Sequence, residues 1–237
     1  MSRTAPPTAA DIAPPVVVEQ RNDKGEVTSR TELVDGVPHG QMTTFGPTGK
    51  PSMQAGYRTG VLNGVMRMWD DGGQLVQEAL YEKGKQQGLT RVYASGRILS
   101  EQMFVQGVLH GETTMYAESG DPGCKLHFRQ GQIEGEALFF NEGSLVRRAI
   151  YKKGLLEGEA IDYDREGTQV QSAHYKANLL DGWLRRYWPN GQVMEELQYK
   201  QGKPVGKPRR YNNKGAKQAG EAAPASLMQR LEKMVRG

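Results

Sequence analysis

The chain has 237 residues, a net charge of +4, 37% hydrophobic residues and 30 glycines. That hydrophobic fraction is low for a protein with one deep core, and the single cysteine, Cys124, excludes an intrachain disulfide framework and a cysteine-based zinc site. No apolar run is long enough for a secretion signal or a membrane span. We therefore expect a soluble, cytoplasmic protein, although a periplasmic protein whose leader had been removed would have the same features.

Residues 1–24 are rich in Pro, Ala and Thr and show no hydrophobic period. This composition is typical of a flexible N-terminal tail or tether.

Residues 25–215 form a repeat with a period of 23 or 24 residues, in which two apolar-and-polar strand patterns alternate with two turns. The glycines of one turn are Gly25, Gly49, Gly73, Gly96, Gly120, Gly143, Gly167, Gly191 and Gly215. The other turn carries Gly-x-x-x-Gly pairs, which are Gly36/Gly40, Gly60/Gly64, Gly84/Gly88, Gly107/Gly111, Gly131/Gly135, Gly154/Gly158 and Gly202/Gly206. Asn178/Gly182 departs from this pattern, but asparagine also tolerates positive φ. Each unit therefore predicts one β-hairpin.

Equivalent residues of successive units form columns, and 15 of the 18 aromatic residues fall into two of these columns. The first column is Leu33, Tyr57, Tyr81, Phe104, Phe128, Tyr151, Tyr175 and Tyr199; the second is Phe45, Trp69, Tyr93, Tyr116, Phe140, Tyr163, Tyr187 and Tyr211. Apolar and charged positions alternate with period two, which is typical of strands exposed on one side. We predict an all-β, elongated single-layer array of about eight antiparallel β-hairpin units.

The segments YEKGKQQGLTRVYASG and YKKGLLEGEAIDYDREG show the motif that repeats: an aromatic residue, a Gly-x-x-x-Gly turn, a short strand, a second aromatic residue and a tip glycine. This motif resembles the MORN-repeat variant of bacterial antitoxin-like and immunity-like proteins of the YwqK type, over about 190 residues. The resemblance implies hairpins laid side by side into a twisted, curved sheet, and a function of neutralising a toxin by binding it. Leu33, Asn178 and the tip sequence at 121–123 depart from the motif without changing the fold expectation.

Residues 216–237 contain a linker and an apolar pattern over Ala225–Arg236, with Ser226 as a candidate N-cap. This pattern predicts a short amphipathic C-terminal helix. Such a helix either caps the last repeat or docks on a partner.

Nothing in the sequence favours catalysis, a cofactor or a metal. His39 and His110 occupy one repeat position, and His127 and His174 occupy another, so the four histidines are explained as repeat residues. There is no Ser-His-Asp order, no H-E-x-x-H motif and no Walker-type loop. We expect a protein that is not an enzyme.

Charge is uneven along the chain. From Lys176 to the end there are 13 Lys and Arg against 5 Asp and Glu, a net charge of +8, while the preceding residues carry −4. Arg185 and Arg186 occupy the same columns as Arg209 and Arg210, so we expect these four guanidinium groups to cluster. This end could be a solvated surface, or could bind an acidic protein, anionic lipid or nucleic acid. Nucleic acid is disfavoured because the aromatic residues are used in the two columns.

These observations favour a non-catalytic binding protein, an antitoxin or immunity protein that occludes a bacterial toxin or secreted effector such as a lipase or nuclease. The alternative is a structural scaffold or adaptor whose basic C-terminal end associates with an anionic membrane surface or a protein complex. The sequence leaves the partner and the oligomeric state open. The predicted partner-binding residues are Trp183, Arg185, Arg186, Trp188, Arg209 and Arg210, because tryptophan and arginine are enriched at binding hot spots. In a purely structural account, Trp183 fills a gap and Trp188 packs on Pro189.

Overall fold

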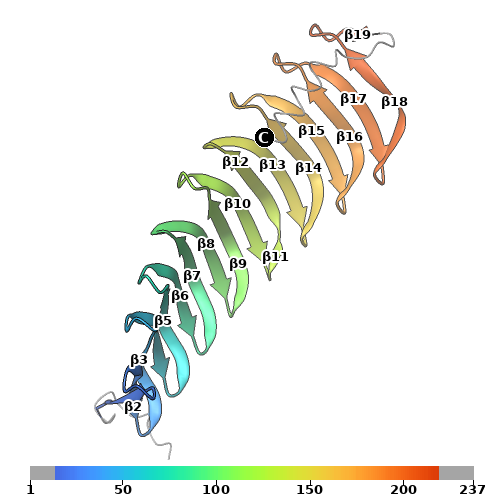
Figure 1. The fold of residues 1–237 in the computed structure, drawn as a ribbon. Helices are drawn as coiled ribbons and strands as arrows, with labels where there is room; N and C mark the ends of the chain where they lie inside the picture. Colours follow the sequence, from blue (N-terminus) through green and yellow to red (C-terminus); the bar gives the residue numbers. More distant parts are fainter. Residues whose placement is uncertain (1–13, 219–237) are drawn as a thin grey trace, which may run out of the picture. The chain divides into compact units, whose positions relative to one another are not determined.

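A computed structural model describes residues 14–218, which hold 19 β-strands and no helix (Figure 1). The chain divides into two units, Met1–Val108 and Leu109–Gly237, and each is described by itself. The predicted all-β array of antiparallel hairpins is confirmed within each unit. The predicted C-terminal helix lies outside the described residues.

In the first unit each strand pairs antiparallel with the next, forming one open sheet. Its strands are β1 (Val16–Arg21), β2 (Val27–Val34), β3 (Val37–Phe45), β4 (Pro51–Arg58), β5 (Val61–Trp69), β6 (Leu75–Glu82), β7 (Lys85–Ala94) and β8 (Arg97–Val105).

The second unit follows the same plan, with one strand interrupted so that β11 and β12 both pair with β10. Its strands are β9 (Val108–Tyr116), β10 (Pro122–Arg129), β11 (Gln132–Ile133), β12 (Gly135–Asn141), β13 (Ser144–Lys152), β14 (Leu155–Tyr163), β15 (Gln169–Lys176), β16 (Leu179–Tyr187), β17 (Val193–Lys200), β18 (Lys203–Tyr211) and β19 (Lys217–Gln218).

The segment predicted to be a flexible tail contains a strand. Strand β1 lies within residues 1–24 and pairs with β2 from Val16↔Leu33 to Arg21↔Val27. The boundary predicted at residue 25 is therefore too late. The reason is that Gly25 closes a hairpin turn, and a hairpin requires a strand before its turn as well as after it.

The Gly-x-x-x-Gly segments begin with two-residue turns in which both residues have positive φ. Thr59 and Gly60 have φ of 48° and 76°, and the exceptional Ala177 and Asn178 have 49° and 67°. Two successive residues with positive φ form the type I′ turn, whose twist matches that of the flanking strands. Asn178 therefore adopts the positive φ that glycine has at this position in the other units, as predicted.

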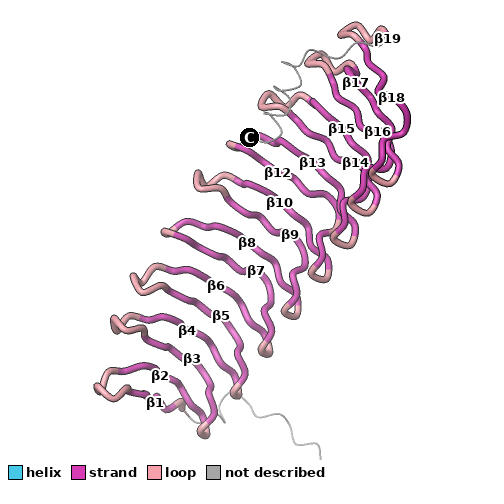
Figure 2. The backbone as a smooth tube through the Cα atoms, turned by 45° about the vertical axis from the view of Figure 1, so that its right-hand side comes forward, coloured by secondary structure: helices cyan, strands magenta, loops and turns pink. Residues whose placement is uncertain are grey.

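Each turn of this kind is hydrogen-bonded to a strand residue that follows the preceding turn in the same unit, and Figure 2 shows the loops at the ends of the strands. The amide of Gly60 donates to the Pro38 carbonyl, and the amide of Gly84 donates to the Leu62 carbonyl, both at 2.8 Å. A side chain adds a second bond: Asn63 accepts from the Lys83 amide at 3.3 Å. These bonds fix each hairpin against the one before it.

The opposite turns, the hairpin tips, explain why the period is sometimes 23 residues. Most tips are longer loops closed by a glycine in the left-handed conformation, such as Gly49, whose amide bonds the Gly46 carbonyl. The tips Ser95-Gly96 and Glu142-Gly143 are instead two-residue turns with positive φ at both residues. Each shorter tip removes one residue from its unit.

The two sides of each sheet differ in character. We call one side the alanine face, because its central row includes Ala55 and Ala79 in the first unit and Ala149 and Ala173 in the second, all at most 3% exposed. Successive strand residues point to opposite sides, so the other side carries the second aromatic column. We call it the tryptophan face, after Trp69 in the first unit and Trp183 in the second.

The turn geometry predicts a graded cost of replacing its glycines. Gly182 has φ of 134°, and an added Cβ would lie 2.8 Å from the His174 Cβ. Gly182→Ala is therefore expected to lower the free energy of unfolding by at least about 1–3 kcal/mol, measured by chemical denaturation. The control is Gly191→Ala, where φ is 80° and nothing lies within 4 Å. The control should cost less because it adds backbone strain without a collision; equal losses would contradict this account.

Candidate functional site

The six predicted partner-binding residues do not form one cluster. Arg185 pairs with Glu196 in the strand register, while Arg186 pairs with Glu195. Adjacent residues of a strand point to opposite faces, so Arg185 lies on the tryptophan face and Arg186 on the alanine face. Arg209 and Arg210 divide in the same way, opposite Glu196 and Glu195. The predicted cluster of four guanidinium groups is therefore wrong.

The tryptophan face of the second unit brings Trp183 together with two of the arginines. The guanidinium carbons of Arg185 and Arg209 lie 5.5 Å and 5.3 Å from the centre of the Trp183 ring. Both arginines also contact the Glu196 carboxylate, at 3.2 Å and 3.5 Å. The Tyr211 hydroxyl donates to Glu196 at 2.9 Å. We call these five residues the Trp183 cluster.

Glu196 holds the Trp183 cluster together as a carboxylate. Burial raises the pKa of Glu196, but hydrogen bonds from Tyr211 and Arg185 lower it by more, so its pKa lies below the ordinary 4.5. The charged form therefore persists as the pH falls. The arginine side chains remain 39% and 55% exposed, so they are held in place while still reaching solvent.

The alanine face of the second unit carries a continuous polar row across β13 to β18. Each pair of neighbours in the row is also paired in the strand register. The row consists of Arg147, Asp162, Gln171, Arg186, Glu195 and Arg210. Its shortest contact joins Arg210 Nε to Glu195 Oε2 at 2.7 Å, and Arg186 contacts both Gln171 and Glu195. Arg186 and Arg210 thus belong to a network that ties strands together.

Asp162 is the most buried member of the polar row, at 5% exposure. Burial raises its pKa above the ordinary 3.8, and the Arg147 guanidinium and the Gln171 amide offset this only in part. Arg147 lies 3.3 Å away and Gln171 donates at 3.0 Å. Asp162 and Glu196 are therefore two carboxyl groups with opposite pKa shifts in one unit.

Trp188 occupies a third location. Its indole nitrogen donates to the Tyr211 carbonyl at 3.1 Å, and in the same tip the Asn190 amide donates to the Asn213 carbonyl at 2.6 Å. Trp188 thus connects two successive hairpin tips. This bonding gives it a structural task apart from the Trp183 cluster.

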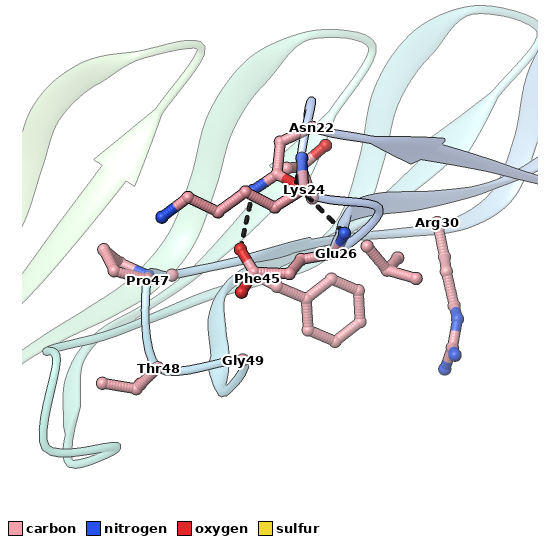
Figure 3. A pocket seen from close by; sticks show the side chains of 11 residues that line it. Asn22, Lys24, Glu26, Arg30, Phe45, Pro47, Thr48 and Gly49 are labelled. Atoms are coloured by element: carbon pink, nitrogen blue, oxygen red, sulfur yellow. Dashed lines mark hydrogen bonds between the residues drawn. The ribbon is translucent and has the colours of Figure 1, made fainter.

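The first unit has a hollow of about 830 Å³ between its first two tips, lined by Phe45 and by charged residues including Lys24, Glu26 and Arg30. Figure 3 shows Arg30 near the Phe45 ring, with its guanidinium carbon 5.5 Å from the ring centre. Arg30 is also paired with Glu19 at 2.7 Å. The hollow is open and its guanidinium group is already engaged, so it offers no convergent catalytic groups.

Within residues 14–218 no group of three His, Cys, Asp or Glu residues could hold a metal ion. His39 lies at a repeat position, as the sequence predicts. Its Nδ1 accepts a hydrogen bond from the Thr59 amide at 3.5 Å, and one unit later Asn63 accepts the equivalent bond from the Lys83 amide. The same stretch includes no helix long and apolar enough to cross a membrane.

Sequence reasoning missed Glu195, Glu196 and Tyr211. The signal was present, because the arginine pair on each strand stands opposite the glutamate pair on the strand between them. Pairing across the hairpin, rather than along the columns, predicts both the carboxylate partners of the arginines and the separation of the arginines onto two faces.

The opposite pKa shifts predict opposite pH dependence for two variants. A raised folded-state pKa means that Asp162 destabilises the fold when charged, so the parent should gain stability relative to Asp162→Asn as the pH falls from 7 through the ordinary 3.8. The lowered pKa of Glu196 means that its stabilisation is present above 4.5, so the parent should lose stability relative to Glu196→Gln over the same descent. Denaturant titrations at several pH values measure both differences.

Each variant is the control for the other, because both remove one carboxyl group from the second unit and leave the other in place. If the two differences change in the same direction as the pH falls, the assigned environments of Asp162 and Glu196 are incorrect.

Comparison with known proteins finds one matching family model and several solved structures of low sequence identity. Residues 62–83 and 180–201 match the model of the MORN repeat variant. No curated protein sequence matches the chain significantly. Similar solved structures include TarM, at 11% identity and a TM-score of 0.28, over 40% of this chain and 20% of that one. They also include TcdB2-TccC3, at 10% identity and a TM-score of 0.17, over 82% of this chain and 14% of that one.

These TM-scores are too low to support an argument about function, and the chain spans at most a fifth of the length of those solved chains. The family match is more informative, because its two stretches cover the turn and strand pattern described above in both units. Residues 62–83 in the first unit and 180–201 in the second are therefore MORN repeat variant units.

Proposed function

We propose that the chain is a non-catalytic binding protein, and specifically an antitoxin or immunity protein that neutralises a bacterial toxin or secreted effector by covering its active site. The observation that carries this proposal is the Trp183 cluster. Trp183 lies beside two arginines that Glu196 holds in position, and tryptophan and arginine are enriched among binding hot-spot residues.

The preorganisation of the cluster supports this role. A partner that binds a mobile arginine must order the side chain at a cost of about 0.5–1.5 kcal/mol. Here the Trp183 ring and the Glu196 carboxylate already position Arg185 and Arg209. Both guanidinium groups can then pair with carboxylates on an acidic partner while Trp183 supplies apolar contact.

The adaptor alternative requires basic groups that reach an anionic surface. Arg186 and Arg210 contact Glu195, and Arg185 and Arg209 contact Glu196, so two carboxylates offset half of the charge of the four arginines. The remaining basic groups that the alternative can use include the exposed lysines Lys200, Lys203 and Lys207. We favour the protein-binding function because the arginine geometry is specific, whereas exposed lysines are common on protein surfaces.

The function can be tested with the protein encoded next to this chain's own gene as the candidate toxin. Coexpression should restore growth, and the purified pair should bind. Trp183→Ala and Arg209→Gln should weaken binding, the first by roughly 30-fold or more, corresponding to about 2 kcal/mol. Calorimetric titration measures the dissociation constants.

Arg210→Gln is the matched control, because it removes the same charge from the adjacent residue on the opposite face. It should leave the dissociation constant unchanged. If Arg209→Gln and Arg210→Gln weaken binding equally, the loss reflects net charge and the Trp183 cluster is not the contact. Failure to bind the candidate, with binding to anionic vesicles that lysine substitutions abolish, would instead support the adaptor function.

A further inference from the structure

The tryptophan face of the first unit carries a solvent-exposed apolar patch. It consists of Val65, Leu80, Leu89 and Met103, whose residues are between 36% and 42% exposed. The register pairs Val65 with Leu80 and Leu89 with Met103. Strands β5 to β8 are consecutive neighbours (Figure 1), so the four side chains form one row across four strands.

The repeat itself does not require apolar residues in this row. In the second unit the equivalent register pairs are Glu112 with His127 and Glu159 with His174. Those hairpins form the same turns and strands with charged or polar residues at these positions. The apolar residues of the first unit are therefore not explained by folding, and exposed apolar rows of this kind mark interaction surfaces.

A charged row runs beside the apolar patch, two residues further along each strand. Its members alternate in sign across β5 to β8: Arg67, Glu78, Arg91 and Glu101. Arg67 contacts Glu78 at 2.7 Å, and Arg91 contacts Glu101 at 2.8 Å and Glu78 at 3.9 Å. The row has two positive and two negative groups. From β5 to β8 the order of the charges is positive, negative, positive, negative, and from β8 to β5 each sign is the opposite.

We propose that this face binds a second copy of the same chain through a two-fold axis parallel to the strands, between β6 and β7. The axis reverses the strand order, so Arg67 faces Glu101 of the second copy and Glu78 faces Arg91 of the second copy. The same operation places Leu80 against Leu89 of the second copy. Every charge then meets its opposite, and the two apolar rows coincide.

This self-complementarity favours a second copy of the chain as the partner of the patch. In a symmetric dimer the same patch contacts itself, so its charge pattern must match its own two-fold image. An alternating row of four charges has this property, whereas a surface for an acidic or a basic partner would carry an excess of one sign. The proposed surface lies in the first unit and is independent of the Trp183 cluster.

The test is sedimentation equilibrium of the full chain over a concentration series. The parent should show a monomer–dimer equilibrium. Leu80→Glu should weaken the dimer at least about tenfold, because two copies each bury a carboxylate against apolar groups. The control is Leu155→Glu in the second unit, since Leu80 and Leu155 are both 42% exposed. It should leave the dissociation constant unchanged, and both variants should keep the thermal midpoint of the parent.

A charge exchange tests the geometry independently of the apolar residues. Arg67→Glu should weaken the dimer, because it places a carboxylate opposite Glu101 of the second copy. Adding Glu101→Arg to that variant should restore the dimer. A chain that stays monomeric at every accessible concentration overturns the proposal. So does a dimer that Leu80→Glu leaves intact, a dimer that Leu155→Glu weakens equally, or a charge exchange without rescue.

Discussion

The whole arrangement depends on a two-residue turn in which both residues have positive φ. Such a turn is open to glycine and asparagine and costs about 1–2 kcal/mol for most other residues, yet Lys83 and Gln201 adopt it before their glycines. The compensation is visible in the bonds from turn to turn: the next turn's glycine amide reaches a carbonyl of the preceding hairpin, and a side chain often bonds the residue before that glycine. A strained turn is thus also the joint between repeats.

Fixing the joints fixes the register, and the register decides which residues share a face. If the register slipped by one residue, every side chain of the strand would move to the opposite face. Ala173 would then leave the alanine face and enter the row of the tryptophan face that includes Ser172 and Glu196. The same rule separates Arg185 from Arg186. One glutamate pair, Glu195 and Glu196, then serves both faces, bonding Arg210 on one side and Tyr211 on the other.

The sequence predicts the repeats well because their turns require particular residues, and it predicts the site less well because the site depends on cross-strand neighbours. The glycine period locates the tips, and Asn178 is correctly interpreted as a substitute for glycine. Composition does not predict strand β1, because residues 1–24 resemble a tail, although Gly25 implies a strand before its turn. Columns along the repeat predict one cluster of four arginines, because they do not contain the alternation of faces within each strand. The pairing of Trp188 with the Tyr211 carbonyl involves a backbone atom, so no side-chain pattern could reveal it.

The two proposed surfaces occupy the same position of the repeat, the residue directly after the second turn glycine. Val65 and Leu89 fill it in the first unit and Trp183 fills it in the second, while Glu136 and Glu159 fill it elsewhere. The position lies on the tryptophan face, outside the alanine row, so its side chain is released from packing and can vary without a cavity cost. Buried members of the alanine row such as Ala149 and Ala160 lack this freedom, because they are at most 1% exposed. In an open sheet whose fold is held by its turns and by one buried row, substitutions at this position can therefore change a binding surface one strand at a time.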